Sequence, residues 1–369
     1  MIDSKEIFVF IIPSLESGGM ERVMCEIVKY ISNILNTECH LVLYGKTRKV
    51  FYDLPKNVQV HKPSFEFNNR YRLWMTFKTM YFIRSIIKKL RPDTVLSFGE
   101  RWNNLVLLSL LGIKTSIFVS DRSSPKINHG FIHNNLRRLL YPLATGVIVQ
   151  TKIAKEIFDS KFKNRNIKVI GNPIREINYN KNIERGKIII SVGRLIRTKH
   201  FDRLINIFAE TDSKDWKLVI IGGDSNKQSN KALLQNRIQE LNLEDRIILK
   251  GVQDNIDEYL LEASIFAFTS SSEGFPNVIG EAMSAGLPVI AYDCISGPSD
   301  MIDNGKNGYL VPLFDDDKFK NNLQYLIDHK IEREIMGVYA KESIKRFSSE
   351  MICKQIYSFI SSKYSINTK

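Results

Sequence analysis

The chain has few cysteines, no long apolar run and, in its first half, few acidic residues. Its 369 residues include four cysteines (Cys25, Cys39, Cys294, Cys353), none in Cys-x-x-Cys spacing, which argues against a disulfide framework or a zinc site. Apolar stretches such as residues 7–12 and 105–111 are far shorter than the roughly 20 residues of a membrane-spanning helix. The first residues lack a signal-peptide pattern. These absences predict a cytoplasmic protein.

Acidic residues are scarce in the first half only. Residues 1–172 hold 27 Lys+Arg and 13 Asp+Glu, a balance of +14, whereas residues 173–369 hold 26 and 27, a balance of −1. A basic half of this kind predicts an anionic partner. Nucleic acid is one such partner, but no recognised nucleic-acid-binding motif accompanies the charge. We therefore expect that the protein does not bind nucleic acid, and a gel-shift assay at physiological salt tests that expectation.

The chain alternates short β-branched apolar runs with segments of helical periodicity, which predicts buried parallel strands joined by crossover helices. Two doubly wound α/β domains follow, residues 1–172 and 173–348, because Gly and Pro break the pattern at residues 169–173. A last helix from about Ser349 has one apolar face. The expected strands are 7–12, 40–44, 58–60, 94–98, 116–119, 146–150, 187–192, 217–221, 247–250, 265–269, 289–292 and 309–311.

Two carboxylates, Glu273 and Glu281, lie eight positions apart in a segment that predicts strand, turn and helix. Gly274-Phe-Pro276 marks the turn, and a helix from about Asn277 to Ala285 would end at Gly286-Leu-Pro288. The free N–H groups and positive dipole end of such a helix suit a bound anion. The alternative explanation is a solvated helix with a capping glutamate. The number of features that occur together in residues 270–293 disfavours it.

This segment resembles the signature of the retaining glycosyltransferases of family four, which have the GT-B fold of two Rossmann-like domains facing each other across a cleft. The resemblance implies that residues 1–172 bind the acceptor, that residues 173–348 bind the nucleotide sugar, and that the C-terminal segment 349–369 joins the first domain. The resemblance implies that Glu281 binds the donor ribose hydroxyls and that the loop Gly274, Phe275, Pro276, Asn277 and Val278 binds the diphosphate and sugar. It places Glu273 against the donor sugar. Whether Glu273 is a nucleophile or only positions and stabilises charge stays open.

Two other segments fit the same family. Arg194 and Lys199 match its cations for the donor diphosphate, where fixed positive charge would stabilise the leaving group. The alternative is that Arg194 and Lys199 are surface cations at the start of a helix with no role in binding. It is less favoured because positive charge at a helix start opposes the helix dipole. Gly18 and Gly19 resemble the family's opening glycine loop, and a tight turn is their alternative explanation. With two cations available, the resemblance implies that no metal or other cofactor is required.

The chain departs from the family where many members carry a first-domain histidine. Asp121 and Arg122 stand there instead and resemble the acidic–Arg pair of bacterial members that build surface polysaccharides on lipid carriers, so we expect them on the acceptor side. His129 and His133 follow at helical spacing and are interpreted as solvated surface. Asp315-Asp-Asp317 has the spacing of a metal-binding motif of another fold, but helix capping explains it better.

The segment from Arg70 to Arg91 holds seven cations and no acid, interleaved with aromatic residues. It fits an amphipathic helix on an anionic membrane surface. It equally fits a crossover helix packed on the sheet. The two explanations are compatible, because packing on the sheet requires only one face of the helix.

Together these features predict a GT-B glycosyltransferase that moves a hexose or N-acetylhexosamine from a nucleotide sugar to a lipid-linked glycan, with retention, at the inner face of a bacterial membrane. The segment Asp293 to Met301 resembles members that use UDP sugars. A GDP-mannose-dependent mannosyltransferase and a nucleotide-sugar epimerase of the same fold are the alternatives, the latter separable by product mass.

Overall fold

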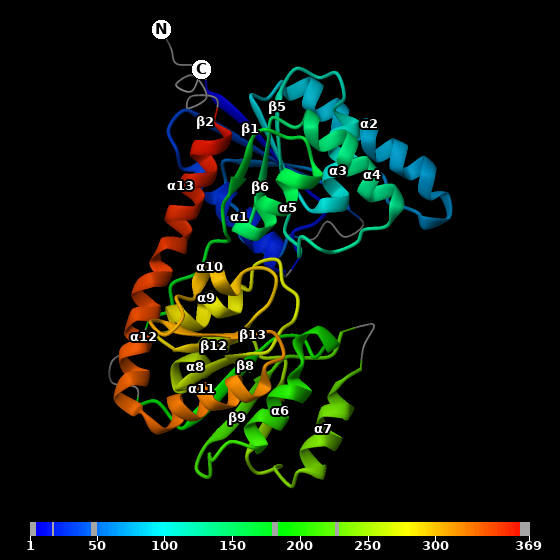
Figure 1. Ribbon diagram of the computed structural model, residues 1–369. Helices are drawn as coiled ribbons and strands as arrows, with labels where there is room; N and C mark the ends of the chain where they lie inside the picture. The colour runs from blue at the N-terminus through cyan, green and yellow to red at the C-terminus, as the bar shows by residue number, and fades with distance from the viewer. Residues whose placement is uncertain (1–4, 17, 46–49, 179–183, 226–228, 362–369) are drawn as a thin grey trace. The chain divides into compact units, whose positions relative to one another are not determined.

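The computed structural model describes residues 5–16, 18–45, 50–178, 184–225 and 229–361, and it divides into two compact units (Figure 1). Unit 1 comprises Met1–Pro173 and Ser349–Lys369, and unit 2 comprises Ile174–Ser348. Each unit contains one sheet, and every strand pairing in both sheets is parallel. The units divide one residue beyond the boundary expected from the sequence.

Unit 1 has seven strands in the order β3-β2-β1-β4-β5-β6-β7. Its inner strand β1 is an almost unbroken apolar run in which Phe8 to Ile12 are fully buried, as expected for a parallel strand covered on both faces. The strands are β1 (Glu6–Ile12), β2 (Thr37–Leu43), β3 (Val58–His61), β4 (Thr94–Phe98), β5 (Ser116–Ser120), β6 (Gly146–Val149) and β7 (Ile167–Val169).

The helices of unit 1 connect these strands. They are α1 (Gly19–Ser32), η1 (Asn69–Tyr71), α2 (Arg72–Leu90), α3 (Glu100–Ser109), α4 (Phe131–Leu140), η2 (Tyr141–Leu143), α5 (Lys152–Lys161) and, from the other end of the chain, α13 (Ser349–Ile360).

Helix α13 belongs to unit 1 and packs on its strands. The ring of Phe359 lies 5.3 Å from that of Phe118, and Ile360 O accepts a hydrogen bond of 2.9 Å from the Thr94 hydroxyl. The Ser361 hydroxyl donates to the Glu6 carboxylate at 2.8 Å. Residues 362–369 of the last expected segment lie outside the described residues.

Unit 2 has six strands in the order β10-β9-β8-β11-β12-β13. They are β8 (Ile188–Val192), β9 (Lys217–Ile221), β10 (Ile247–Gly251), β11 (Ile265–Phe268), β12 (Val289–Asp293) and β13 (Gly308–Pro312). Its helices are η3 (Arg197–Lys199), α6 (Phe201–Ala209), α7 (Lys231–Glu240), α8 (Ile256–Glu262), α9 (Asn277–Ser284), α10 (Pro298–Met301), α11 (Asp316–Asp328), α12 (Lys330–Ile344) and η4 (Lys345–Phe347).

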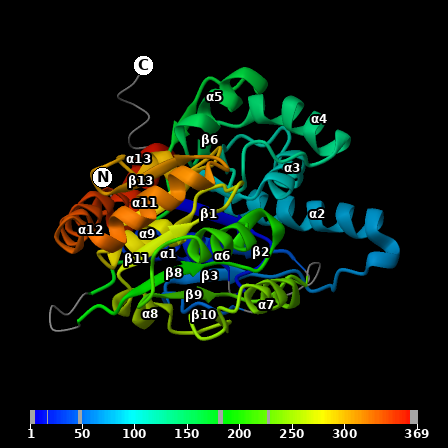
Figure 2. The same ribbon diagram turned by 60° about the horizontal axis from the view of Figure 1, so that its bottom comes forward.

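The cores of unit 2 lie on opposite faces of its sheet, and helices cover both faces (Figure 2). Ile190 and Val192 belong to the core that includes α9 residues, whereas the alternate residue Ile189 packs with α6 and α11. This alternation follows from the two-residue period of a strand. Both faces are therefore apolar, which explains why the strands read as continuous apolar runs.

In each unit the strand order reverses beside the first strand. β1 lies between β2 and β4, and β8 lies between β9 and β11. Ligands of open α/β sheets bind at the carboxyl ends of the strands at such a point. No helix in the described part of the chain is long and apolar enough to cross a membrane.

Candidate active site

Lys199 and Glu273 meet at the carboxyl edge of the unit 2 sheet. Lys199 ends η3 in the connection after β8, and Glu273 lies in the connection after β11. Lys199 Nζ donates to Glu273 Oε1 at 2.7 Å, and it lies 4.9 Å from the centre of the Phe268 ring. The side chains are only 15% and 17% exposed. The structure thus places a predicted cation directly beside the predicted sugar-facing carboxylate.

The second connection is joined to the backbone carbonyls of the first by one backbone and two side-chain hydrogen bonds. Thr198 O accepts from the Ser271 N–H at 2.9 Å and from the Ser270 hydroxyl at 3.1 Å, and Lys199 O accepts from the Thr269 hydroxyl at 2.8 Å. The serine-rich loop before Glu273 therefore holds Lys199 in position.

The Gly274-Phe-Pro276 turn is anchored from both sides. Phe275 is buried, and its ring lies 5.4 Å from that of Phe347. Gly274 O accepts from the Ser296 hydroxyl at 2.9 Å. Gly297 has φ +105°, and a Cβ there would lie 2.1 Å from Pro276 Cδ, so only glycine fits. Helix α9 then begins at Asn277 with no side-chain cap; the Asn277 N–H donates to Phe275 O at 2.9 Å and the Ile279 N–H donates to Pro276 O at 3.0 Å.

Glu281 lies one turn into α9 and is mostly buried. Its Oε1 is 3.4 Å from Arg175 Nε, and Arg175 also pairs with Asp257 of α8. Gly280 lies against Ile174, where a Cβ would come within 2.6 Å of Ile174 Cδ1. Helix α9 is thus packed closely enough to fix the direction of Glu281. Arg175 was not predicted from the sequence.

Arg194 occupies the loop directly after β8 and is exposed, unlike Lys199. This loop crosses the end of β9 closely: a Cβ on Gly222 would lie 1.8 Å from Gly193 O. The close crossing brings the β8 loop against the end of the neighbouring strand. Both predicted cations therefore lie at the same sheet edge, one paired and one in solvent.

Gly18 and Gly19 lie at the carboxyl end of β1 in unit 1. The Tyr52 hydroxyl binds both backbone groups of Gly18, accepting from its N–H at 3.1 Å and donating to its O at 2.9 Å. Gly18 has an extended backbone, with Glu21 Oε2 only 2.3 Å from the site of a Cβ. Gly19 begins α1. A side chain at Gly18 would therefore require the Glu21 carboxylate to move.

Asp121 and Arg122 follow β5, but their side chains have different surroundings. The Asp121 carboxylate is buried and accepts from Tyr141 at 2.6 Å, from Asn103 at 3.1 Å and from Arg137. Burial raises the pKa of Asp121 to about 6. These contacts make Asp121 a core residue that fixes the end of β5. Of the expected pair, Arg122 is therefore the residue left to contact the acceptor.

Arg122 has both satisfied and unsatisfied groups. Its guanidinium lies 4.0 Å from the centre of the Phe98 ring, and Nη1 donates to Asn172 Oδ1 at 2.5 Å. Glu100 Oε1 accepts from its backbone N–H at 2.8 Å. Nε and Nη2 are buried without a partner among the described residues, and burial lowers the pKa of Arg122 to about 9. A buried donor without an acceptor is costly, so these N–H groups are suited to a ligand oxygen.

Two minor predictions have different outcomes. The carboxylate of Asp315 accepts from the Lys318 N–H at 3.0 Å, which confirms helix capping. The histidine interpretation was wrong: His129 and His133 are both half-buried rather than solvated, and His129 precedes α4 while His133 is on it. The difference arises because a bend at Gly130, with φ +89°, interrupts the apparent helical spacing.

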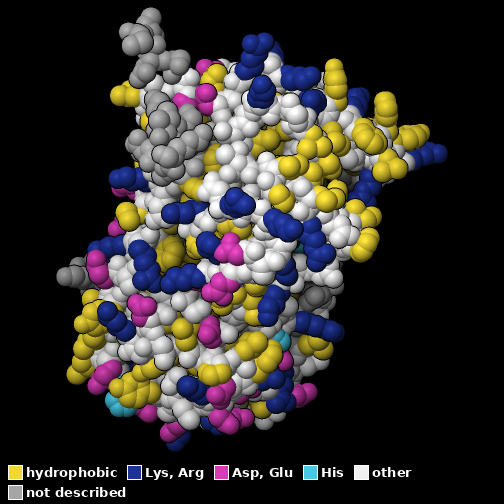
Figure 3. Space-filling model, turned by 45° about the horizontal axis from the view of Figure 1, so that its top comes forward, with side chains coloured by type: hydrophobic (Ala, Val, Ile, Leu, Met, Phe, Trp, Pro, Cys, Tyr) yellow, Lys and Arg dark blue, Asp and Glu magenta, His cyan; other side chains and the backbone are white. Residues whose placement is uncertain are grey.

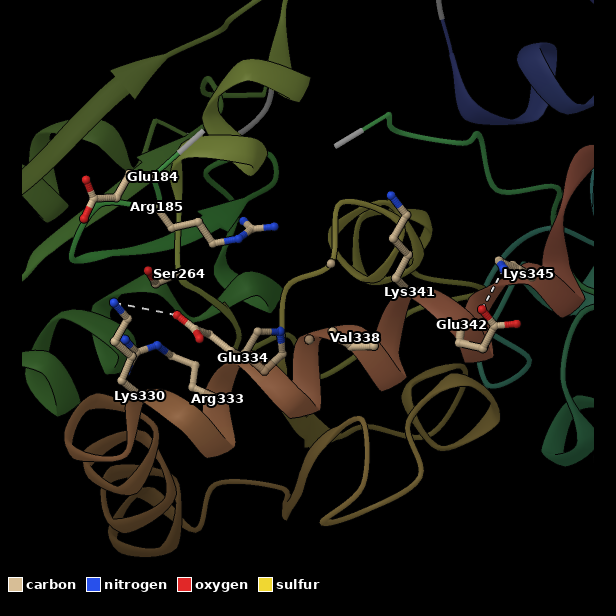
Figure 4. A pocket seen from close by; sticks show the side chains of 13 residues that line it. Glu184, Arg185, Ser264, Lys330, Arg333, Glu334, Val338, Lys341, Glu342 and Lys345 are labelled. Carbon is tan, nitrogen blue, oxygen red and sulfur yellow. Dashed lines mark hydrogen bonds and ion pairs between the residues drawn. The ribbon is translucent and has the colours of Figure 1, made fainter. Parts of the chain in front are cut away.

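A cavity of about 750 Å³ lies at the opposite edge of the unit 2 sheet (Figure 4). Ser264 and Pro288, which line it, directly precede β11 and β12, so the cavity is at the amino ends of the strands. The same view shows the ion pair Lys330–Glu334 on α12 and the ion pair between Glu342 of α12 and Lys345 of η4. None of the predicted site residues lines this cavity, and we assign the cavity no part in the active site.

The fold and the site geometry define a class: paired Rossmann-like units with charged residues at the carboxyl edges of parallel sheets, as in GT-B glycosyltransferases. Residues 17–176 match the family model described as Glycosyltransferase Family 4, and residues 174–343 match that described as Glycosyl transferases group 1. The chain belongs to this family of glycosyltransferases, as the sequence motifs predicted.

Two relatives agree with this assignment, and one solved structure agrees with the fold. The amylovoran biosynthesis glycosyltransferase AmsD of Erwinia amylovora is 29% identical over 351 residues, which cover 92% of this chain and 95% of that protein. The N-acetylgalactosamine-N,N'-diacetylbacillosaminyl-diphospho-undecaprenol 4-alpha-N-acetylgalactosaminyltransferase of Campylobacter jejuni is 28% identical over 373 residues, 96% and 98% of the two chains. The crystal structure of HepE of Anabaena in complex with UDP superposes with a TM-score of 0.78 at 18% identity, covering 96% and 98%.

Proposed function

We propose that the protein transfers a hexose or N-acetylhexosamine from a UDP sugar to a lipid-linked glycan, with retention and without a metal ion, in the synthesis of a bacterial surface polysaccharide. The Lys199–Glu273 pair, 2.7 Å apart at the carboxyl edge of unit 2, is the observation that carries the proposal. It joins a cation suited to a leaving diphosphate with a carboxylate suited to the sugar. The similarity to a diphospho-undecaprenol-dependent relative supports the lipid-linked acceptor, and the UDP complex of HepE supports the uridine donor.

In the proposed reaction the bond between the anomeric carbon and the diphosphate breaks, and a bond to an acceptor hydroxyl forms on the same face of the sugar. The hydroxyl proton leaves with the diphosphate. Lys199 has three N–H groups, and Glu273 is the one acceptor recorded for it among the described residues. Its other N–H groups, with exposed Arg194, stabilise the negative charge that develops on the diphosphate. Glu281 binds the ribose hydroxyls, and Glu273 contacts the donor sugar.

Thermal unfolding with UDP, GDP and ADP sugars tests the donor. A ligand at 100 times its dissociation constant stabilises by about 2.7 kcal/mol, which raises the melting temperature of a unit of this size by roughly 5–11 °C. We expect the shift with UDP sugars and its loss in Glu281→Ala, whereas Glu244→Ala, an exposed glutamate of the same unit, keeps it. A shift with GDP-mannose alone would favour the mannosyltransferase, and an isomerised nucleotide sugar would favour the epimerase. A shift that survives Glu281→Ala would contradict the assigned role of Glu281.

Metal independence has its own test. We expect transfer to continue in EDTA, because Arg194 and Lys199 supply the positive charge for the diphosphate. Loss of transfer in EDTA, with recovery on adding Mg²⁺ or Mn²⁺, would contradict this part of the proposal.

We further propose that unit 1 associates with the anionic inner face of the membrane through α2 and α4. Helix α2 buries only one stripe, Met75, Thr79, Ile83 and Ile87, and so packs on the core as a crossover helix. Its other faces expose apolar side chains beside its cations. Figure 3 shows hydrophobic and basic side chains together where α2 and α4 lie in Figure 1. The exposed apolar residues of the two helices are Leu73, Trp74, Phe77, Tyr81, Phe131, Ile132 and Leu139.

Vesicle sedimentation tests this surface. Each basic residue near an anionic surface contributes about 1 kcal/mol, and salt weakens the contribution. We expect binding to vesicles with anionic lipid that falls as salt rises, and weaker binding of Trp74→Ser with Phe77→Ser. Equal binding to neutral vesicles at low and high salt would contradict the proposal.

A further inference from the structure

A second cavity, of about 580 Å³, lies wholly within unit 1. Pro13 and Ser14 line it directly after β1, and Tyr44 lines it directly after β2, so it opens at the carboxyl edge of the sheet. Helices α2, α3 and α4 supply much of the remaining lining, together with Gly45, Phe67 and Asn69, and these helices lie together in Figure 1. None of the predicted site residues lines it.

Aromatic rings form one wall of this cavity. Tyr44 is buried, and its ring packs edge-to-face on Trp102 with the centroids 5.9 Å apart. Trp102 is 43% exposed, which leaves part of its ring available to a ligand. The negative face of an aromatic ring attracts electropositive C–H groups such as those of a pyranose. Trp102 is therefore suited to stack against a sugar.

The same cavity holds two buried polar atoms with unmet hydrogen bonds. The Tyr44 hydroxyl and His133 Nδ1 are buried and have no hydrogen-bond partner among the described residues. Tyr44 as a whole is 3% exposed, and it lines the cavity. A buried polar group left unsatisfied costs about 1–3 kcal/mol. A ligand with several hydroxyl groups would satisfy both atoms.

Two arginines give the cavity a positive charge. Arg72 begins α2 and Arg101 is on α3; both are exposed, and no side-chain partner is recorded for either among the described residues. Both act on His133, whose pKa is lowered first by burial and then by these two cations. No Asp or Glu is among the described residues that line the cavity. The positive charge is therefore not neutralised locally.

We propose that this cavity binds a sugar residue of the acceptor glycan that carries an anionic group, either a carboxylate or a phosphate. Trp102 stacks on the pyranose, the Tyr44 hydroxyl binds a sugar hydroxyl, and Arg72 with Arg101 binds the anion. An apolar ligand would leave the hydroxyl and the arginines unused, and inorganic phosphate would leave the aromatic wall unused. The inference rests on the proposed function, because it takes the ligand to be the acceptor.

Fluorine NMR of the full chain labelled with 5-fluorotryptophan provides a direct test. The chain has three tryptophans, Trp74, Trp102 and Trp216, so Trp→Phe variants assign every signal. Trp216 is buried in the core of unit 2 and serves as an internal control. Glucose, glucuronate and glucose 6-phosphate are titrated in turn, the last two distinguishing carboxylate from phosphate.

We expect the Trp102 signal alone to shift in a saturable manner, with at least tenfold tighter binding of one anionic sugar than of glucose. Arg72→Gln with Arg101→Gln should abolish that preference and leave glucose binding unchanged, whereas Lys114→Gln, an exposed residue outside the cavity, should keep it. Tyr44→Phe should weaken binding of all three sugars severalfold, and a melting temperature no lower than that of the wild type would show that it folds.

Several outcomes would overturn the inference: no shift of the Trp102 signal with any sugar, equal affinity for neutral and anionic sugars, or a response to farnesyl phosphate but not to sugars. Neither donor nor turnover is needed for this measurement. Loss of UDP-sugar stabilisation with intact sugar binding at Trp102 would refute the proposed donor function alone. The converse result would refute the sugar site alone.

Discussion

Replacing Lys199 by methionine tests whether the Lys199–Glu273 pair is a coupled, poorly solvated unit. Methionine keeps most of the side-chain volume but leaves the Glu273 carboxylate without its cation. Breaking a fully buried pair costs about 3–5 kcal/mol. Because these side chains are 15% and 17% exposed, we expect a smaller loss, about 2–3 kcal/mol. For a unit of this size that loss lowers the melting temperature by roughly 4–12 °C.

The double variant Lys199→Met with Glu273→Gln separates charge from packing. It removes both charges, so no unpaired carboxylate is left, and we expect it to unfold at a higher temperature than Lys199→Met alone. Lys187→Met is the matched control, since Lys187 pairs with Asp215 at 3.0 Å but the two side chains are 60% and 75% exposed. Exposed pairs contribute about 0–1 kcal/mol. All variants are compared by circular dichroism and differential scanning fluorimetry.

The reasoning would be refuted if Lys199→Met unfolded no earlier than Lys187→Met, or if the double variant were less stable than Lys199→Met. Either result would mean that water screens the pair despite its burial. Transfer activity gives an independent measurement. Loss of a charge-stabilising contact of this kind costs about 2.7–4 kcal/mol of barrier, so both Lys199 variants should lose about two to three orders of magnitude in kcat.

Two further predictions concern the turn before α9 and the histidines of unit 1. Gly297→Ala should lose about 3 kcal/mol of unfolding free energy and should lose donor binding, because the positive φ costs about 1–2 kcal/mol and the methyl group would overlap Pro276. The control is Gly305→Ala, which has φ +78° and open space around it and should show the backbone strain alone. Equal losses of the two variants in denaturant titrations would contradict the overlap at Pro276. His40 Nδ1 lies 3.1 Å from His61 Nε2, and burial lowers the pKa of both histidines, with Lys89 adding to the effect on His61 and Glu38 opposing it on His40. The contribution of the two histidines to stability is therefore present above about pH 6.5 and is lost as the pH falls toward their folded pKa values. Urea midpoints measured from pH 8 to 5.5 should fall in the wild type and should fall less steeply in His40→Asn. Equal slopes in the two proteins would contradict the role given to this histidine pair.

The sequence predicted the sheets well because buried parallel strands are apolar on both faces. All twelve expected strands are present, with small shifts of their ends. The strand β7 was missed, since it is three residues long and includes the exposed Lys168 at the sheet edge. The polar start of β2 at Thr37 and Glu38 was missed because those side chains are not fully buried. Short or half-solvated edges carry too weak a pattern for prediction.

The site was predictable as motifs but not as contacts. Lys199 and Glu273 were identified separately, yet they are 74 positions apart, and no local pattern indicates that they pair. Adjacent Asp121 and Arg122 were expected to act together, but the chain directs one carboxylate into the core. Trp102 and Tyr44 were missed altogether. Their one signal was position, since each follows the end of a strand, and that position becomes informative only once the strand order is known.

The last described helix has a consequence for how the protein is made. Unit 1 contains α13, with Phe359, Ile360 and Ser361 packed on strands from the start of the chain. All of unit 2 precedes α13 in the sequence, so a ribosome that synthesises the chain delivers every residue of unit 2 first. The amino-terminal unit therefore cannot complete its core until α13 has emerged, which reverses the usual order in which amino-terminal domains fold first during synthesis.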